Sequence, residues 1–305
     1  MTKTRSGFIS IVGKPNVGKS TLLNRLVGTK LAAVSDKPQM TRQVIRGILT
    51  EPRGQIVFLD APGFHKPKDS LGRLMAKEAA QALLDADLYF FMVEPKLPSD
   101  SDAEWVRLVE ENAGFKDRSD TSKKKKPIFC LINKVDAVSK PTLLPVLEAY
   151  QALCNFDELI PISSLKGEQT DVLLEKSFEY LPEGEHYFPD DITSDQAERF
   201  LAAECIREKV FRFTGAEVPY STAVQIESFK EDGQLLRIDA VIFVERDSQK
   251  AILIGAKGSK MKQLGTAARI ALEEFCGRKV FLKLWVKTLK NWKQDEGKLK
   301  QIGFS

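Results

Sequence analysis

A glycine-rich segment near the N-terminus has the residue types and spacing of a phosphate-binding loop. Gly13 is followed by four residues and then by Gly18-Lys19-Ser20, directly after an apolar run at residues 8–12. Glycines let backbone N–H groups approach the α- and β-phosphates, Lys19 can reach the β- and γ-phosphates, and the Ser20 hydroxyl can ligate Mg²⁺. The residues that we expect to contact phosphate are Gly13, Lys14, Pro15, Asn16, Val17, Gly18, Lys19, Ser20 and Thr21.

Two further segments can respond to the γ-phosphate of a nucleotide. Asp60-Ala61-Pro62-Gly63 follows a second apolar run, and its carboxylate can hold Mg²⁺ through water while the Gly63 N–H meets the γ-phosphate. Thr41, within the polar residues 38–42, is the candidate that closes on Mg²⁺ when the γ-phosphate is present. The sequence therefore predicts a metal site made of Ser20, Thr41 and Asp60, with Ala61 and Pro62 also near the nucleotide.

The segment Asn133-Lys134-Val135-Asp136 can distinguish guanine from adenine. Its Asp136 carboxylate can accept hydrogen bonds from guanine N1–H and N2–H, whereas adenine offers no such pair and leaves the carboxylate unpaired. Asn133 can bond the O6 edge or brace the phosphate loop, and the Lys134 stem can lie along the base. Backbone N–H groups of Ser163, Ser164 and Leu165 can point at guanine O6.

These segments must be brought together by alternating strands and helices. Apolar runs predict strands at residues 8–12, 44–49, 55–60, 88–93, 128–132 and 159–162. Helical patterns fall at residues 20–28, 70–84, 100–112, 142–153 and 170–181. Such an alternation indicates an α/β fold, with a mostly parallel sheet and helices on both faces. Ligands bind at the carboxyl ends of parallel strands, which is where the motifs fall.

Length and composition predict a second domain after these elements. The chain has 305 residues, is 43% hydrophobic and contains no apolar run long enough to span a bilayer. Four scattered cysteines and two histidines argue against a zinc site or a disulfide framework and favour a reducing cytoplasm. The first strand begins too early to leave room for a signal peptide. Residues 182–191 hold two prolines, a glycine and four acids, so we predict domains at residues 1–182 and 183–305.

The second domain has the pattern of an RNA-binding module. Residues 193–196 are expected to cap a helix that runs to about residue 213, and strands are expected at 220–229, 235–245 and 280–286. Before the last strand, the loop Gly255-Ala256-Lys257-Gly258 precedes a helix that carries Lys260 and Lys262. Such a loop can approach a nucleic-acid backbone closely, and the lysines add positive charge. The element order resembles the prokaryotic, type II KH domain, a smaller α+β fold.

The charge distribution favours a polyanionic partner for this domain. A net charge of +4 conceals a gradient, because residues 183–247 carry 7 Lys/Arg against 15 Asp/Glu and residues 248–305 carry 13 against 4. Trp285 and Trp292 stand among lysines and can stack on bases, with packing as the alternative for Trp285. The run Lys123–Lys126 is typical of an exposed loop rather than of an RNA contact.

Together these motifs resemble the Era subfamily of translation-factor-class GTPases over nearly the whole chain. Two positions depart from the family pattern: Met40 replaces a usual threonine and Ser164 a usual alanine. The resemblance implies a switch that uses GTP, GDP and Mg²⁺, binds the 3′ end of small-subunit ribosomal RNA and assists maturation of the small ribosomal subunit. It also implies a cytoplasmic protein with peripheral association with the cytoplasmic face of the cell membrane. We expect a monomer and no DNA partner.

The residues after Asp60–Gly63 argue against a glutamine that orients the attacking water. Phe64 stands at that position, with His65 next, and phenylalanine cannot orient water. The resemblance extends to GTPases whose phosphate-loop asparagine ligates potassium, so Asn16 is the candidate K⁺ ligand. A slow reaction stimulated by a partner or by potassium is expected. The residues assigned to hydrolysis are Asn16, Lys19, Thr41, Asp60 and Gly63.

Two other functions are compatible with parts of the sequence. The second domain of a GTPase can dock a protein partner instead of RNA, with loop glycines that are only structural. A phosphate loop also occurs in kinases and ATPases, although Asp136 argues against them. A tandem GTPase is excluded because the chain has one phosphate loop and one Asn-Lys-x-Asp segment.

Overall fold

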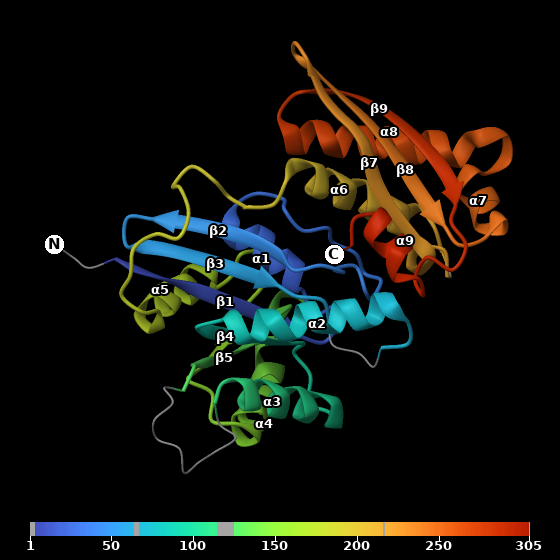
Figure 1. Ribbon diagram of the computed structural model, residues 1–305. Coiled ribbons are helices and arrows are strands. Elements are labelled where there is room, and N and C mark those ends of the chain that lie inside the picture. Colours follow the sequence, from blue (N-terminus) through green and yellow to red (C-terminus); the bar gives the residue numbers. More distant parts are fainter. Residues whose placement is uncertain (1–3, 64–66, 115–124, 216, 305) are drawn as a thin grey trace. The chain divides into compact units, whose positions relative to one another are not determined.

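The computed structural model describes residues 4–63, 67–114, 125–215 and 217–304, and these residues form two compact units. Within the described ranges, unit 1 takes residues 4–31, 41–63 and 75–195, and unit 2 takes the remainder (Figure 1). The predictions made for Phe64, His65, Lys123 and Lys124 lie outside the described residues. The predicted domain boundary after residue 182 stays a prediction.

Unit 1 is built on a six-stranded sheet within the described residues. The strands are β1 (Arg5–Gly13), β2 (Ile45–Glu51), β3 (Gly54–Asp60), β4 (Leu88–Val93), β5 (Ile128–Ile132) and β6 (Glu158–Pro161). Their order is β2-β3-β1-β4-β5-β6, and all neighbours are parallel except β2 and β3. The predicted mostly parallel α/β sheet is therefore confirmed.

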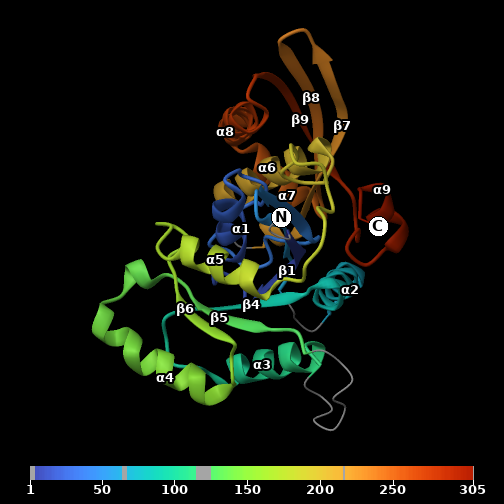
Figure 2. The same ribbon diagram turned by 90° about the vertical axis from the view of Figure 1, so that its left-hand side faces the viewer.

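Helices cover both faces of this sheet. They are α1 (Lys19–Val27), α2 (Ser70–Asp85), α3 (Asp100–Asn112), α4 (Leu143–Leu153) and α5 (Thr170–Tyr180). Alternate strand residues such as Tyr89 and Phe91 pack against α3 and α4 in one buried cluster. On the opposite face of the sheet, Gly47 of β2 packs closely against Leu23 of α1. Figures 1 and 2 show α3 and α4 on one side of the sheet and α1 and α5 on the other.

The strand register aligns the carboxyl ends that carry the motifs. Ile11 of β1 pairs with Asp60 of β3, Gly13 pairs with Met92 of β4, and Val93 pairs with Ile132 of β5. The residues that follow β1, β3 and β5 therefore share one edge of the sheet. Two short 3-10 helices, Val135–Ala137 and Lys140–Thr142, lead from β5 into α4.

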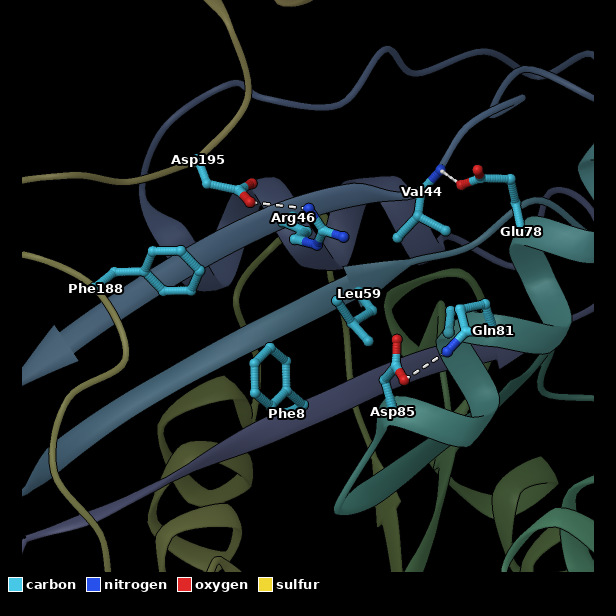
Figure 3. Close-up of a pocket in the computed structure, with 10 residues that line it drawn as sticks. Phe8, Val44, Arg46, Leu59, Glu78, Gln81, Asp85, Phe188 and Asp195 are labelled. Carbon is cyan, nitrogen blue, oxygen red and sulfur yellow. Dashed lines mark hydrogen bonds and ion pairs between the residues drawn. The ribbon is translucent and has the colours of Figure 1, made fainter. Parts of the chain in front are cut away.

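Residues 183–195 lie along the sheet of unit 1. They help to line a pocket of about 550 Å³ between the strands and α2 (Figure 3), together with side chains such as Phe8 and Leu59. The polar groups of this pocket are engaged with one another, because Arg46 pairs with Asp195 at 2.9 Å and Glu78 accepts from the Val44 N–H at 3.4 Å. None of the predicted nucleotide-contacting residues lines it.

The expectation that residues 193–196 cap a helix is wrong. The helix begins later, at Glu198, with Ala197 at its N-cap. The Ser194 hydroxyl instead donates to the Arg46 carbonyl at 2.6 Å, and Asp195 binds the Arg46 guanidinium. Ser194 and Asp195, residue types that often cap helices, here bind Arg46 and so hold residues 193–195 against β2.

Unit 2 contains a three-stranded sheet whose longer helices pack on one face, while the short C-terminal helix lies against part of the other (Figure 2). Its elements are α6 (Glu198–Phe213), a 3-10 turn (Pro219–Ser221), β7 (Thr222–Asp232), β8 (Leu235–Val244), α7 (Asp247–Ile254), a second 3-10 turn (Ala256–Gly258), α8 (Ser259–Cys276), β9 (Lys279–Thr288) and α9 (Glu296–Gln301). The order is β7-β8-β9, with β7 antiparallel and β9 parallel to β8. Ala202 and Ile206 of α6 and Ala268 and Leu272 of α8 pack on Ile238 and its neighbours, which confirms the KH-type element order.

Trp292 belongs to the core of unit 2. Its side chain is fully buried, its Nε1 donates to the Ser221 carbonyl at 3.3 Å, and its ring stacks on Phe304. The expectation that Trp292 stacks on bases is therefore wrong, because no face of the ring is left for a ligand. Trp285, in contrast, is 42% exposed. Within the described ranges, no helix is both long and apolar enough to cross a membrane.

Candidate nucleotide-binding site

The phosphate loop links β1 to α1 in a conformation that requires glycine at two positions. Gly13 and Gly18 have φ values of 141° and 110°. A Cβ at Gly13 would lie 2.3 Å from the Met92 carbonyl oxygen, and a Cβ at Gly18 would lie 2.2 Å from Asn133 Nδ2. Both positions thus need glycine because Met92 and Asn133 pack closely against them, in addition to the approach of phosphate. The second requirement becomes visible only in three dimensions, because Asn133 is remote in sequence.

Lys19 is held inside the loop. Its Nζ donates to the Gly13 carbonyl at 3.0 Å and to the Lys14 carbonyl at 3.1 Å, and the side chain is buried. Burial lowers the pKa of the Lys19 ammonium, an effect that the nearby Asp60 carboxylate opposes. An anion placed in the loop would replace these carbonyl contacts by a charge-assisted one. Thr21 lies in the first turn of α1.

The three predicted metal ligands converge. The Ser20 hydroxyl donates to Asp60 Oδ2 at 2.5 Å, and the Thr41 Oγ1 lies 3.2 Å from Ser20 Oγ and 3.4 Å from Asp60 Oδ2. Burial raises the pKa of the Asp60 carboxyl, and Lys19 and the two hydroxyls oppose this shift. Among the described residues, the buried Asp60 Oδ1 has no hydrogen-bond partner. One carboxylate and two hydroxyls fit Mg²⁺, which takes few protein ligands and completes its shell with water and phosphate oxygens.

Asn133 braces the loop rather than facing a base. Its Nδ2 donates to the Val17 carbonyl at 2.7 Å, while its Oδ1 accepts from the Ser164 N–H and hydroxyl, both at 2.9 Å. The serine that replaces the usual alanine thus adds a hydrogen bond to this brace. These are the contacts of the bracing role, and the contact with the O6 edge stays a prediction.

Asp136 is exposed, and one oxygen of its carboxylate is held in place by a neighbouring serine. The Ser163 hydroxyl donates to Asp136 Oδ1 at 2.6 Å. The N–H groups of Ser163 and Ser164 donate to the Glu168 carbonyl and to Asn133 Oδ1, so a contact with guanine O6 would have to share or replace these hydrogen bonds, and the predicted contacts stay predictions. The third N–H group considered, that of Leu165, makes no backbone hydrogen bond within the part of the chain that the structure describes, and this residue is 65% exposed.

Three residues that the sequence reasoning missed support the site. Glu94 pairs with the Lys134 ammonium at 2.6 Å, and Lys134 also donates to the Asn16 carbonyl at 2.7 Å. Asp102 pairs with the Lys14 ammonium at 2.8 Å, which directs this side chain away from the loop interior. Arg25 donates to the carbonyls of Ser164 and Leu165. Glu94 directly follows β4, so the rule that ligands bind at the carboxyl ends of parallel strands could have identified it.

Within unit 2, the residues that precede Thr41 are bound to α6. The Val34 N–H donates to Glu208 at 3.3 Å, Lys37 donates to the Phe211 carbonyl, and the Arg207 guanidinium donates to the Met40 carbonyl. Met40 and Ala33 are buried against Phe211. The departure from threonine at position 40 is therefore an apolar packing residue. The first turn of α2 is bound similarly, with the Ser70 hydroxyl donating to the Gln294 carbonyl at 2.8 Å.

The Gly255–Gly258 loop joins α7 to α8. Gly255 and Gly258 have φ values of 71° and 75°, and Lys257 has a φ of 50°. A Cβ at Gly255 would lie 2.7 Å from that of Lys260, whereas a Cβ at Gly258 meets nothing within 4 Å. The first turn of α8 holds no acidic residue, so Lys260 and Lys262 add positive charge to an N-terminus that is already positive. This combination favours an anion at the loop, with Ala256 and Lys257 exposed beside it.

The fold and these two regions define a phosphate-loop GTPase joined to a KH domain. Residues 8–134 match the family model described as 50S ribosome-binding GTPase, and residues 217–293 match the KH domain model. The GTPase Era proteins of Geobacter metallireducens and Staphylococcus haemolyticus are 47% and 42% identical to this chain, over 99% and 100% of it and 98% of each relative.

Two solved structures agree with this assignment. An Aquifex aeolicus Era variant bound to GDP·AlF4⁻ is 38% identical, with a TM-score of 0.91 over 99% of this chain and 100% of that one. A structure of Era in complex with MgGDPNP and nucleotides 1506–1542 of 16S ribosomal RNA is 38% identical, with a TM-score of 0.90 over 99% of both chains. The chain therefore belongs to the GTPase Era family, whose members hydrolyse GTP.

Proposed function

We propose that this chain is a magnesium-dependent GTP switch that binds the 3′ end of small-subunit ribosomal RNA and assists maturation of the small ribosomal subunit. The observation that carries the proposal is the position of the segment before Thr41. Residues 32–40 pack with α6 in the unit that contains the KH domain, while Thr41 contacts the predicted metal ligands Ser20 and Asp60. A change in the contacts of Thr41 therefore acts on a segment that the RNA-binding unit holds.

We propose the following roles for the main residues of the nucleotide site. Lys19 and the N–H groups of residues 13–21 bind the phosphates, and Asp136 accepts from guanine N1–H and N2–H. Bound Mg²⁺ would neutralise charge between the β- and γ-phosphates, held by Ser20, Thr41 and Asp60. Gly63 donates its N–H to the γ-phosphate. Asn16, exposed in the loop with a φ of 66°, is the proposed potassium ligand.

The RNA site is proposed at the Gly255–Gly258 loop and the start of α8. The related Era structure in complex with nucleotides 1506–1542 of 16S ribosomal RNA supports ribosomal RNA as the partner class. The open space at Gly258 and the exposed lysines of residues 257 and 262 suit close approach of a phosphate backbone. We place the protein in the cytoplasm, as a monomer with peripheral membrane association.

A matched pair of glycine variants tests the RNA site. Gly258→Asp places a carboxylate beside the loop, and Gly277→Asp places one at the other end of α8, where φ is also positive and the space is also open. We expect Gly258→Asp to weaken binding of an RNA of nucleotides 1506–1542 at least ~10-fold, with a smaller salt dependence, because it opposes phosphate contacts. Gly277→Asp, which lies outside the loop, should weaken binding much less than Gly258→Asp.

The nucleotide dependence is measured with the same RNA and the full chain, saturated with GDP or with GDPNP and Mg²⁺. We expect a different affinity in the two states. Equal affinities would reject the switch, and no binding in either state would favour the alternative, a KH unit that docks a protein. Depletion of the protein should lead to accumulation of unprocessed small-subunit RNA. Normal processing in depleted cells would contradict the role in maturation.

A further inference from the structure

The strand β9 exposes a row of alternating lysines and aromatic rings on the face of its sheet that points away from α6 and α8. Val280, Leu282, Leu284 and Val286 point toward the helices and pack in the core. The intervening residues therefore point the opposite way, and we call them the outward face of β9: Lys279, Phe281, Lys283, Trp285 and Lys287. Figures 1 and 2 show α6 and α8 on one side of the sheet and the upper part of the other side uncovered.

Both rings of this row are exposed to an extent that packing does not explain. Phe281 is 41% and Trp285 42% exposed, whereas Trp105 and Trp292 are buried. The Arg237 guanidinium lies 5.4 Å and Lys283 Nζ 5.7 Å from the centroid of the Phe281 ring. Among the described residues, Trp285 makes no ring or cation contact. Large exposed rings on a regular strand are typical of a binding surface.

The charged side chains around the two rings favour a negatively charged partner. Across the sheet, Lys230 is opposite Arg237 and Arg237 is opposite Phe281, so both basic residues share the outward face. Three carboxylates lie there too. Asp232 pairs with Arg237 at 2.7 Å, Glu227 pairs with Lys287 at 2.8 Å, and Asp239 is opposite Lys283 in the register. Five basic side chains against three acidic ones leave the surface positive.

The spacing within the row matches a single-stranded nucleic acid. Phe281 and Trp285 are four residues apart on one strand, which separates them by roughly 13 Å, with Lys283 midway. Bases stack on such rings irrespective of sequence, and the intervening lysines can contact phosphates. An apolar protein partner would gain nothing from Lys283 between the two rings.

We propose that the outward face of β9 is a second contact surface for single-stranded RNA, on which Trp285 and Phe281 stack on bases. This proposal rests on the proposed RNA-binding function and extends it to a face that the Gly255–Gly258 loop does not occupy. The loop joins α7 and α8, whose Leu253 and Leu264 pack on the inner face of the sheet. Within the described residues β9 is an edge strand, so an RNA strand can pass around it from one face to the other.

Substitution of the rings tests the surface in the full chain loaded with GDPNP and Mg²⁺. We expect Trp285→Leu and Phe281→Leu each to weaken binding of the RNA of nucleotides 1506–1542 by ~5- to 100-fold, the range of one lost base stack. Lys283→Ala should reduce the slope of log K against log salt by about 0.7. Ile270→Ala, which removes a 45% exposed apolar side chain from α8, is the matched control and should bind normally.

Tryptophan fluorescence gives a readout without substitution. Trp285 is the exposed one of the three tryptophans, so acrylamide should quench it in the free protein and quench it less when RNA is bound. Normal RNA affinity of both ring variants, with unchanged acrylamide access, would overturn the second surface and leave the proposed function intact. If the unmodified protein binds no RNA, both proposals fall. If the ring variants lose RNA binding and Gly258→Asp does not, the second surface stands and the loop assignment fails.

Discussion

The guanidinium of Arg207 donates a hydrogen bond to the carbonyl oxygen of Met40, the residue immediately before Thr41. Arg207 is 2% exposed, and Glu204 one turn earlier in α6 accepts a second hydrogen bond from it. On the other side of one peptide bond, Thr41 lies 3.2 Å from the Ser20 hydroxyl. We therefore expect a movement of Thr41 toward or away from a metal ion to change the Arg207 contact.

Removal of the Arg207 contact should uncouple RNA affinity from the nucleotide. We choose Arg207→Met with Glu204→Gln, because removing one partner alone would leave a buried charge unpaired. Nucleotide affinity should persist, while the ratio of RNA affinities in the GDPNP and GDP states falls toward 1. Coupling free energies of this kind are typically about 1–3 kcal/mol, or ~5- to 150-fold. Arg212→Met, at an exposed position of the same helix, is the control. If the double variant keeps the same ratio of RNA affinities, the Arg207–Met40 contact does not couple the nucleotide to RNA binding.

The packing of Gly18 on Asn133 predicts different effects of alanine at two glycines of positive φ. At Gly18 the new Cβ would lie 2.2 Å from Asn133 Nδ2, whereas at Gly28, where φ is 76°, it meets nothing within 4 Å. Gly18→Ala should reduce GDP affinity at least ~100-fold, because it displaces the residue that braces the loop. Gly28→Ala should cost about 1 kcal/mol in the free energy of unfolding and leave GDP affinity unchanged. Calorimetric titration and urea unfolding measure the two, and equal GDP affinities would contradict the brace.

The elements that carry the motifs were predictable from the sequence because their signals are local. Apolar runs located β1, β3 and β5, and the rule that ligands bind at strand carboxyl ends brought Ser20 and Asp60 together. The structure agrees, with 2.5 Å between their oxygens.

Features that depend on long-range contacts were missed or mistaken. Ser194 and Asp195 have the character of a helix cap, but Arg46 of a distant strand binds them both. Trp292 stands among lysines in sequence, yet folding places it in a core against Ser221 and Phe304. The binding of residues 32–40 to α6 has no local signal at all, because it joins segments about 170 residues apart in the sequence.

The carboxylate of Asp136 predicts a change of base preference on substitution. Asp136→Asn can no longer accept from both N1–H and N2–H of guanine, and two charge-assisted hydrogen bonds correspond to a loss of roughly 10²- to 10⁴-fold in GTP affinity. Xanthine carries a carbonyl where guanine carries the amino group, so the amide of the variant can donate to it, and XTP should bind better than GTP. Asp171→Asn, at an exposed position of α5, should leave both affinities unchanged. Tight GTP binding by Asp136→Asn would remove Asp136 from the specificity site.

The ion pair between Glu94 and Lys134 predicts a pH-dependent contribution to stability. The hydrogen bond from Lys134, together with that from Lys96, lowers the pKa of the Glu94 carboxyl below its usual value of 4.5. A carboxyl whose pKa is depressed on folding stabilises the protein above its unfolded pKa, and this contribution is lost as the pH falls through the folded pKa. Both side chains are partly exposed, so Glu94→Gln should cost only about 0.2–1 kcal/mol at pH 7.

Urea unfolding of both proteins between pH 7 and pH 3 measures this effect. The difference in free energy of unfolding between the unmodified protein and Glu94→Gln should be constant above about pH 5 and shrink toward zero below pH 4. Because Lys134 also donates to the Asn16 carbonyl in the phosphate loop, the variant should bind GDP ~2- to 5-fold more weakly at pH 7. Glu104→Gln, at an exposed position of α3, is the control for both measurements. A pH-independent difference would show that Glu94 acts through packing, since loss of a charge contact cannot persist once the carboxyl is protonated.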